Sequence, residues 1–166
     1  IQSDINNKKI DNNKCIFTSM KDRNLDFLLN VWIKNIITKR SSSKLYVTPV
    51  NRNLEKFNIY NRNFGTKENL LVDIASSRLC LIPGHKAELF CIAAEEAREL
   101  CVPIVSMGIG SLSERIDNGK TGFIASNEKQ FAEYTIELMD NNKLWNIMHN
   151  NMLQMRGSMQ WAYISK

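Results

Sequence analysis

The chain has 166 residues, enough to bury the core of one domain, and 43% of them are hydrophobic, which is ordinary for a globular protein. No stretch approaches the roughly 20 apolar residues of a membrane-spanning helix. The net charge of +5 is modest, and its only basic cluster, residues 37–44, falls where a helix is expected to end. We interpret this cluster as a solvated helix end, and we expect no nucleic-acid partner.

Four cysteines are spread along the chain without the spacing of metal ligands. No two of them form a Cys-x-x-Cys pair, and no histidine lies at a matching distance. We therefore expect buried free thiols in a reducing cytoplasm, in place of a zinc site or disulfides, at Cys15, Cys80, Cys91 and Cys101.

Short apolar runs alternate with longer segments that carry an apolar stripe at helical spacing. The runs predict strands at 14–19, 44–48, 78–83, 103–107 and 122–125. The stripes predict helices at 23–39, 66–77, from Leu89 or Phe90 onward, and at about 128–140 and 143–155. Residues 49–65 are weakly patterned, and we predict a loop there that can include a short helix.

Several of the predicted strands are apolar throughout instead of alternating. Such strands are typical of a parallel sheet with helices on both faces. The chain is therefore predicted to be an α/β domain with a Rossmann-like, doubly wound parallel sheet. Ligands of such folds bind at the carboxyl ends of the strands, so the candidate loops follow residues 19, 48, 83 and 107.

Two carboxylates, Glu88 and Glu96, stand eight residues apart around the start of the third predicted helix. Eight helical residues rise about 12 Å, a distance comparable to a ribose–diphosphate–hexose chain. The first free amides of this helix, with Phe90, Cys91 and Ile92 as candidates, could hold a diphosphate. On spacing alone, the pattern favours a dipole partner at Glu88 and a solvated residue at Glu96 over a ligand site.

The segment "ELFCIAAEEARELCVPIVSMGIGSLSERIDNGKTGFIA" (88–125) resembles the donor-binding half of glycosyltransferase family 4, whose members are retaining enzymes of GT-B fold. The family motif has a Glu, seven residues, then Glu-Ala, which match Glu88 and Glu96-Ala97. The pieces "CVPIV", "IGSLSE" and "DNGKTGF" follow in the family's order. Upstream, "FTSMKDRNLDFLLNVW" and "LLVDIASSRLCLIP" are also similar to its strands and helices.

This resemblance implies that residues 1–166 form one nucleotide-sugar-binding domain, the C-terminal half of a two-domain enzyme. The N-terminal domain, which would carry the acceptor site, is not in this chain. The implied reaction transfers a hexose with retention from a UDP- or GDP-linked sugar to a glycan, lipid or protein acceptor. By the same resemblance Glu88 contacts the donor sugar and Arg23 faces the diphosphate, both as catalytic residues, while Glu96 binds the ribose.

Further donor-binding residues are expected in the loops at the sheet edge. Ser19 lies after the first strand, His85 lies just before Glu88, and Gly110 lies in a turn after the fourth predicted strand. A plain exposed loop explains His85 equally well, and turn geometry alone explains Gly110. The chain departs from the family pattern at Leu89 and Cys101, where many members carry glycine, and Leu89 could hinder the approach of a donor phosphate.

No metal or other cofactor is expected, because cationic side chains and helix amides would neutralise the diphosphate. A cytoplasmic location with at most peripheral membrane association follows from the composition and the resemblance. We expect the isolated domain to bind donor weakly and to transfer little or no sugar. The alternative is a non-catalytic, degenerate module that binds nucleotide sugars or a protein partner.

Overall fold

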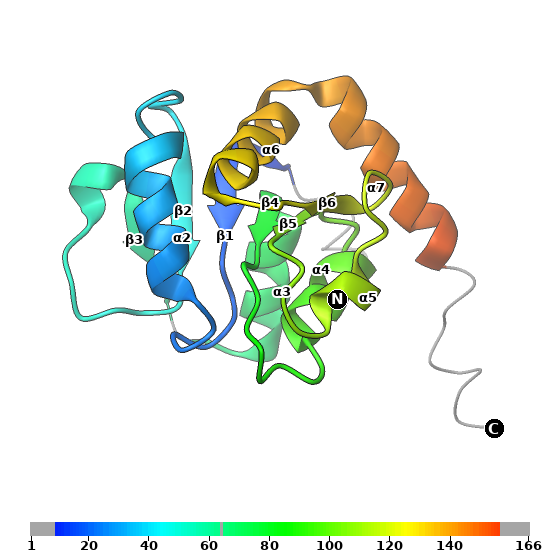
Figure 1. Cartoon of the computed structure of the whole chain (residues 1–166), viewed down its shortest axis with the longest axis horizontal. Helices are drawn as coiled ribbons and strands as arrows, with labels where there is room; N and C mark the ends of the chain where they lie inside the picture. The colour runs from blue at the N-terminus through cyan, green and yellow to red at the C-terminus, as the bar shows by residue number, and fades with distance from the viewer. Residues whose placement is uncertain (1–8, 64, 157–166) are drawn as a thin grey trace.

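Six parallel strands form one sheet in the computed structural model, which describes residues 9–63 and 65–156 (Figure 1). Their order across the sheet is β3-β2-β1-β4-β5-β6, so the chain winds outward in one direction and then returns to wind in the other. The strands are β1 (Asp11–Ile16), β2 (Lys44–Val47), β3 (Ile59–Asn61), β4 (Ser77–Leu81), β5 (Ile104–Ser106) and β6 (Gly122–Ile124).

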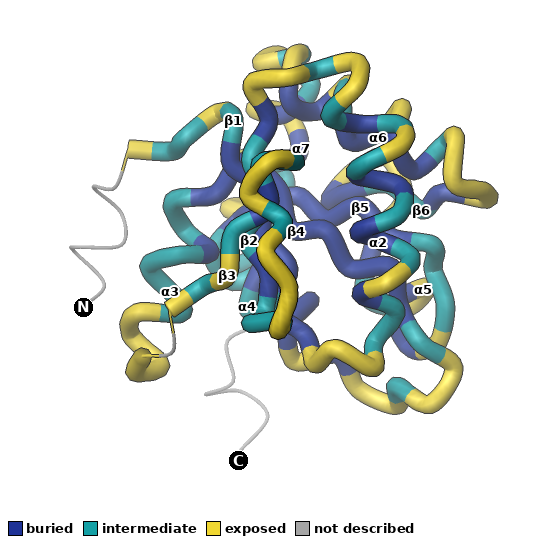
Figure 2. Tube along the Cα trace, turned by 90° about the vertical axis from the view of Figure 1, so that its left-hand side faces the viewer, coloured by how far each residue is buried: buried dark blue, intermediate teal, exposed yellow. Residues whose placement is uncertain are grey.

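Helices cover both faces of this sheet, and each face has its own apolar core. One core packs against α2 (Leu25–Val31), the π-helical segment η1 (Trp32–Ile36) and α6 (Glu128–Asp140). The other packs against α3 (Lys67–Ala75), α4 (Ile92–Glu99) and α5 (Leu112–Arg115), and α7 (Asn142–Arg156) contacts both α6 and α4. The strands lie buried at the centre, and exposed residues concentrate in the outer loops and helix faces (Figure 2).

Burial explains why the central strands read as continuous apolar runs. All five residues of β4 and all three of β5 are buried, because helices cover both of their sides. Strand β2, which lies nearer the edge, alternates between buried and half-buried residues. The prediction of a doubly wound parallel sheet is confirmed, and no helix of the described ranges is long and apolar enough to cross a membrane.

The first strand, predicted at 14–19, lies three residues earlier as β1, and three further element predictions differ from the structure. Strand β3 was not predicted, because its three residues lie within a polar, asparagine-rich run, while the short helix expected in that region is the 3-10 turn η2 (Glu55–Phe57). The predicted helix 23–39 begins at Leu25 and changes to π-helix, where the Ile37 amide bonds to the Trp32 carbonyl at 3.0 Å. The third difference, the start of α4, affects the site and is described below.

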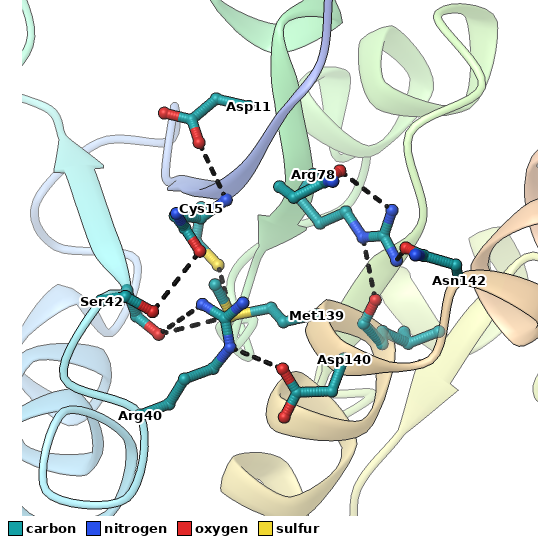
Figure 3. Close-up of polar contacts among 12 residues, drawn as sticks. Asp11, Cys15, Arg40, Ser42, Arg78, Met139, Asp140 and Asn142 are labelled. Atoms are coloured by element: carbon teal, nitrogen blue, oxygen red, sulfur yellow. Dashed lines mark hydrogen bonds and ion pairs between the residues drawn. The ribbon is translucent and has the colours of Figure 1, made fainter.

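A buried arginine fastens α6 and α7 to the edge of the sheet opposite the strand carboxyl ends (Figure 3). Arg78, only 3% exposed, donates to the Leu138 carbonyl at 3.0 Å and to the side chains of Asn12 at 3.2 Å and Asn142 at 2.8 Å. Its guanidinium also lies 4.7 Å from the centre of the Trp145 ring. Burial lowers the pKa of Arg78, and nearby Arg40 lowers it further.

Candidate functional site

The candidate site lies where strands β1 and β4 are neighbours but their connections leave in opposite directions. At such a switch point the two following loops diverge and leave a crevice at the carboxyl edge of the sheet. Here the loop after β1 and the loop after β4 are tied together by two contacts. The Asn24 side-chain amide donates to the Gly84 carbonyl, and Arg23 Nη1 lies 3.4 Å from His85 Nδ1. The structure therefore brings the predicted residues Arg23 and His85 together.

The surroundings of His85 define its neutral tautomer. Its Nδ1 accepts the Ala87 amide at 3.1 Å and also faces the Arg23 guanidinium. Both of these groups can only donate, so Nδ1 carries no proton and the ring N–H is on Nε2. Arg23 and the Ala87 amide thus hold the ring so that Nε2 can donate a hydrogen bond to a ligand.

Glu88 is held firmly by its own backbone. Its amide bonds to the His85 carbonyl at 3.0 Å, and its carbonyl accepts the Ser111 amide at 3.1 Å. One carboxylate oxygen, Oε2, is buried and has no hydrogen-bond partner among the described residues, and the same is true of Ser111 Oγ. The weakly donating Cys91 thiol also interacts with this carboxylate, but a buried carboxylate oxygen without a strong donor is still costly, which suits a position that serves a ligand.

Gly110 packs against the backbone of the loop that carries His85 and Glu88. Its φ is +71°, and a Cβ atom at this position would lie 2.4 Å from the His85 carbonyl oxygen and 3.0 Å from that of Glu88. Glycine is therefore required by the close approach of the loop after β5 to the loop after β4. The predicted contact between Gly110 and the donor stays a prediction.

The helix that carries Glu96 begins later than predicted. The sequence pattern predicted a start at Leu89 or Phe90, but α4 begins at Ile92 with Cys91 as the N-cap residue. The apolar residues before Ile92 suggested one more helical turn, yet Leu89 is 91% exposed, so its side chain lies in solvent. The free amides at the start of the helix are therefore those of the N-cap residue Cys91 and of Ile92 and Ala93, while Phe90 precedes the helix. The predicted contacts of Phe90, Cys91 and Ile92 with the donor stay predictions.

The two residues removed from the helix have other contacts. The ring of Phe90 is 46% exposed and lies 4.1 Å from the guanidinium of Arg115. Cys91 is fully buried, and this burial raises the pKa of its thiol to about 12, with a further increase from the nearby Glu88 carboxylate. Cys91 is therefore a neutral packing residue beside Glu88 and no candidate nucleophile. The other three cysteines are also buried, as predicted.

Glu96 has a partner that the sequence did not indicate. Its side chain is 13% exposed and forms an ion pair with Lys67 Nζ at the start of α3. The neighbouring Glu95 is also buried, and it pairs with Arg98 and, at 2.8 Å, with Arg115. Glu95 thus joins α4 to α5, whereas Glu96 faces α3.

A cavity of about 390 Å³, here called the β1–β3 cavity, opens beside the Lys67–Glu96 pair. It is lined by residues after β1 (Thr18, Ser19, Met20), after β2 (Thr48, Pro49), after β3 (Arg62, Asn63) and at the start of α3 (Gly65, Thr66, Lys67, Leu70). Buried polar atoms without a hydrogen-bond partner among the described residues belong to three of them: Thr18 Oγ1, Ser19 Oγ and Arg62 Nε. Such unpartnered groups indicate a cavity made for a polar ligand.

The first turn of α3 closes one side of this cavity. Thr66 accepts the Asn69 amide at 3.4 Å and so caps the helix that was predicted to begin here. Sequence reasoning missed Arg62, because it directly follows the unpredicted strand β3. It missed Lys67, because the ion pair with Glu96 joins residues 29 positions apart on two helices. The described ranges contain no group of three His, Cys, Asp or Glu side chains arranged for a metal ion.

The family model described as glycosyl transferases group 1 matches residues 63–155, more than half of the chain. The chain belongs to this family. The match begins just after β3 and includes both carboxylates of the motif, Glu88 and Glu96. No curated protein sequence matches the chain.

Solved structures of low sequence identity share the fold. Sucrose-phosphate synthase from Thermosynechococcus elongatus is 13% identical with a TM-score of 0.74, covering 98% of this chain and 45% of that one. The pneumococcal O-GlcNAc transferase GtfA, in complex with UDP and GlcNAc, is 16% identical with a TM-score of 0.72, covering 90% and 33%. The likeness identifies this chain's fold as that of the C-terminal domain of a GT-B glycosyltransferase.

This glycosyl transferases group 1 domain spans less than half of these two solved chains. A third structure, the C-terminal domain of LpcC from Francisella tularensis, was determined as a separate domain. It is 16% identical with a TM-score of 0.70, covering 95% of this chain and 90% of that one.

Proposed function

We propose that this chain is the donor-binding domain of a retaining hexosyltransferase of family 4, and that it takes a UDP- or GDP-linked sugar. The observation that carries the proposal is the convergence of three ligand-binding features at one sheet edge. These are the Arg23–His85 contact, the inward Glu88 carboxylate, and the β1–β3 cavity beside Glu96. Each suits a different part of a nucleotide sugar.

The diphosphate would lie at the start of α4. The amides of Ile92 and Ala93 have no partner within their own helix, and the positive end of the helix dipole lies there. Arg23, with a side chain 25% exposed, adds a fixed cation on the opposite loop. Charge grows on the diphosphate as the sugar–phosphate bond breaks, so these groups would stabilise the leaving group.

The nucleoside would occupy the β1–β3 cavity. Glu96 stands beside it, where a carboxylate can accept hydrogen bonds from ribose hydroxyls. The unpartnered Ser19 Oγ and Arg62 Nε supply polar contacts for the base or ribose. This assignment keeps Ser19 as a donor-binding residue and adds Arg62.

The sugar would lie against Glu88. Its buried Oε2 can accept a hydroxyl, Ser111 Oγ stands on the adjacent segment, and His85 Nε2 can donate. Transfer with retention would pass through an oxocarbenium-like transition state, and Glu88 would hold the sugar in place as the diphosphate departs. The acceptor would be bound by an N-terminal domain outside this chain. We propose that the reaction proceeds without a metal ion.

The solved relatives support this choice of ligand. The pneumococcal transferase was solved with UDP and GlcNAc, and HepE from Anabaena, 11% identical with a TM-score of 0.70, was solved with UDP and glucose. UDP together with a sugar is therefore found in two solved proteins of this fold. For this chain the identity of the base and of the sugar is part of the proposal.

Calorimetric titration of the chain with UDP, GDP and ADP, then with their sugars, tests the proposal. We expect one nucleotide to bind, and Glu96→Ala to weaken it about tenfold through the lost ribose contacts. Glu99→Ala is the matched control, since Glu99 lies on the same helix and pairs with Arg98 at 3.8 Å. If a folded sample binds none of the nucleotides, or if both variants behave alike, the donor-site assignment is wrong.

One observation favours the alternative of a non-catalytic interaction module. Large apolar side chains are exposed around the site, namely Leu89 at 91%, Met20 at 66% and Ile92 at 62%. Such groups are typical of a surface that contacts another domain or protein. A chain that binds a nucleotide sugar, but whose full-length form transfers no sugar to any acceptor tested, would favour this alternative over the enzyme.

A further inference from the structure

Lys67 lies between the β1–β3 cavity, where the nucleoside is proposed to bind, and the helix α4 that carries Glu96. It is the first residue of α3, it lines the β1–β3 cavity, and its ammonium pairs with the Glu96 carboxylate. The Lys67 side chain is 57% exposed and that of Glu96 only 13%. The carboxylate is thus largely withdrawn from water, while the ammonium stays accessible to a ligand.

The position of Glu96 on α4 gives this pair an electrostatic role. Glu96 follows Ile92 by four residues, which is a rise of about 6 Å along the helix. Side chains on a helix tilt toward its N-terminus, so the carboxylate leans toward the free amides of the first turn. An unpaired carboxylate at this distance would repel an anion bound to those amides. Lys67 removes that repulsion.

We propose that Lys67 is a specificity-determining residue that makes this site select nucleoside diphosphates over uncharged nucleosides. It does so by neutralising Glu96, so that one carboxylate can serve the ribose without repelling the adjacent diphosphate. The flexible four-carbon stem also lets the ammonium approach the phosphates when the ribose hydroxyls engage Glu96. This inference rests on the proposed function, because it assumes a nucleotide with its ribose at Glu96.

The test compares a charged ligand with its uncharged counterpart. Calorimetry measures binding of UDP and of uridine, with GDP and guanosine as a second pair, to the wild-type chain and to Lys67→Gln. We expect the affinity for the diphosphate relative to its nucleoside to fall about tenfold in Lys67→Gln, because only the charged ligand meets the unpaired carboxylate. Nucleoside affinity should stay within about twofold, since an uncharged ligand is not repelled.

Three further variants separate charge from structure. Lys129→Gln makes the same change of charge on α6, where Lys129 pairs with Glu133 at 3.8 Å, and should leave the ratio of affinities unchanged. Lys67→Arg should preserve the ratio. The double variant Lys67→Gln/Glu96→Gln should restore the ratio toward that of the wild type, because it removes the unpaired carboxylate, although both ligands lose their ribose contacts.

Three results would overturn the inference. If Lys67→Gln weakens diphosphate and nucleoside by the same factor, Lys67 only supports the cavity wall. If Glu96→Ala weakens the nucleotide as expected but Lys67→Gln leaves the ratio unchanged, the proposed function stands and the role of Lys67 is wrong. Failure of the wild-type chain to bind any of the four ligands would overturn both.

Discussion

At the scale of single residues, the site depends on two loops that approach unusually closely. Gly110 permits this, since a Cβ atom there would collide with the His85 carbonyl oxygen, and His85 and Glu88 belong to the proposed sugar site. The left-handed backbone of Gly110 is shared by Gly119, whose φ is +82°, but a Cβ atom added at Gly119 would meet nothing within 4 Å. An alanine at Gly119 would suffer only the strain of a left-handed backbone, whereas an alanine at Gly110 would also collide with the His85 carbonyl oxygen.

We predict that Gly119→Ala lowers the free energy of unfolding by about 1 kcal/mol, the cost of a left-handed alanine. Gly110→Ala should lower it by about 3 kcal/mol, because the backbone of the His85 loop must also move. Urea denaturation measures both. Equal losses in the two variants would show that the contact between the loops is not constrained as described.

The sequence placed some of these residues correctly and could not place others. Arg23, His85 and Glu88 lie in loops that a doubly wound sheet must bring to the same edge, so strand order alone predicts that they meet. The contacts of His85 Nδ1 with the Ala87 amide and Arg23 depend on the conformation of the loop backbone, which the sequence pattern does not predict. Lys67 meets Glu96 across 29 positions of sequence, and nothing in the local pattern of either residue indicates this contact.

At the scale of elements, Arg78 on β4 donates to three neutral acceptors, one each on α6, α7 and β1 (Figure 3). Arg40 nearby donates to Asp140 at 2.8 Å, whose side chain is 59% exposed, and to the Ser43 hydroxyl at 3.2 Å. Both arginines thus contact the end of α6. Removal of Arg78 leaves the buried Leu138 carbonyl without this donor and uncovers the Trp145 ring, whereas Arg40 serves a solvated carboxylate and a hydroxyl that also contacts Met139. Their losses should therefore differ.

We predict that Arg78→Met lowers the free energy of unfolding by about 3 kcal/mol, since the buried Leu138 carbonyl loses this donor and the contact of the guanidinium with the Trp145 ring is lost. Arg40→Met should cost about 1 kcal/mol, as expected for a pair with a solvated partner. Thermal and urea unfolding of both variants provide the comparison. A cost for Arg40→Met as large as that for Arg78→Met would contradict the assigned roles.

Element boundaries were predictable where periodicity was long and caps were clear. Helix α6 was predicted at about 128–140 and spans Glu128–Asp140, and its N-cap Asn127 accepts the Gln130 amide at 2.9 Å. Strand β3 was missed, because three residues cannot establish a period. The start of α4 was misplaced, because Leu89 and Phe90 read as apolar helix residues although their side chains are exposed.

At the scale of the whole molecule, strand order determines where a ligand can bind. The order β3-β2-β1-β4-β5-β6 places the switch point between β1 and β4, and the candidate residues gather at that edge. The sequence predicted this class of sheet from continuous apolar strands. It could not predict the size or lining of the β1–β3 cavity, which depends on how β3 and the first turn of α3 pack.

The central claim is that a nucleotide sugar binds across this edge, with its nucleoside in the β1–β3 cavity and its diphosphate at the start of α4. The most direct test maps the backbone amide signals of the chain by NMR during a titration with UDP and with GDP. We predict the largest shifts at Ile92 and Ala93, with further shifts at Ser19 and Lys67. Shifts confined to other surfaces, or none at saturating nucleotide, would contradict the account.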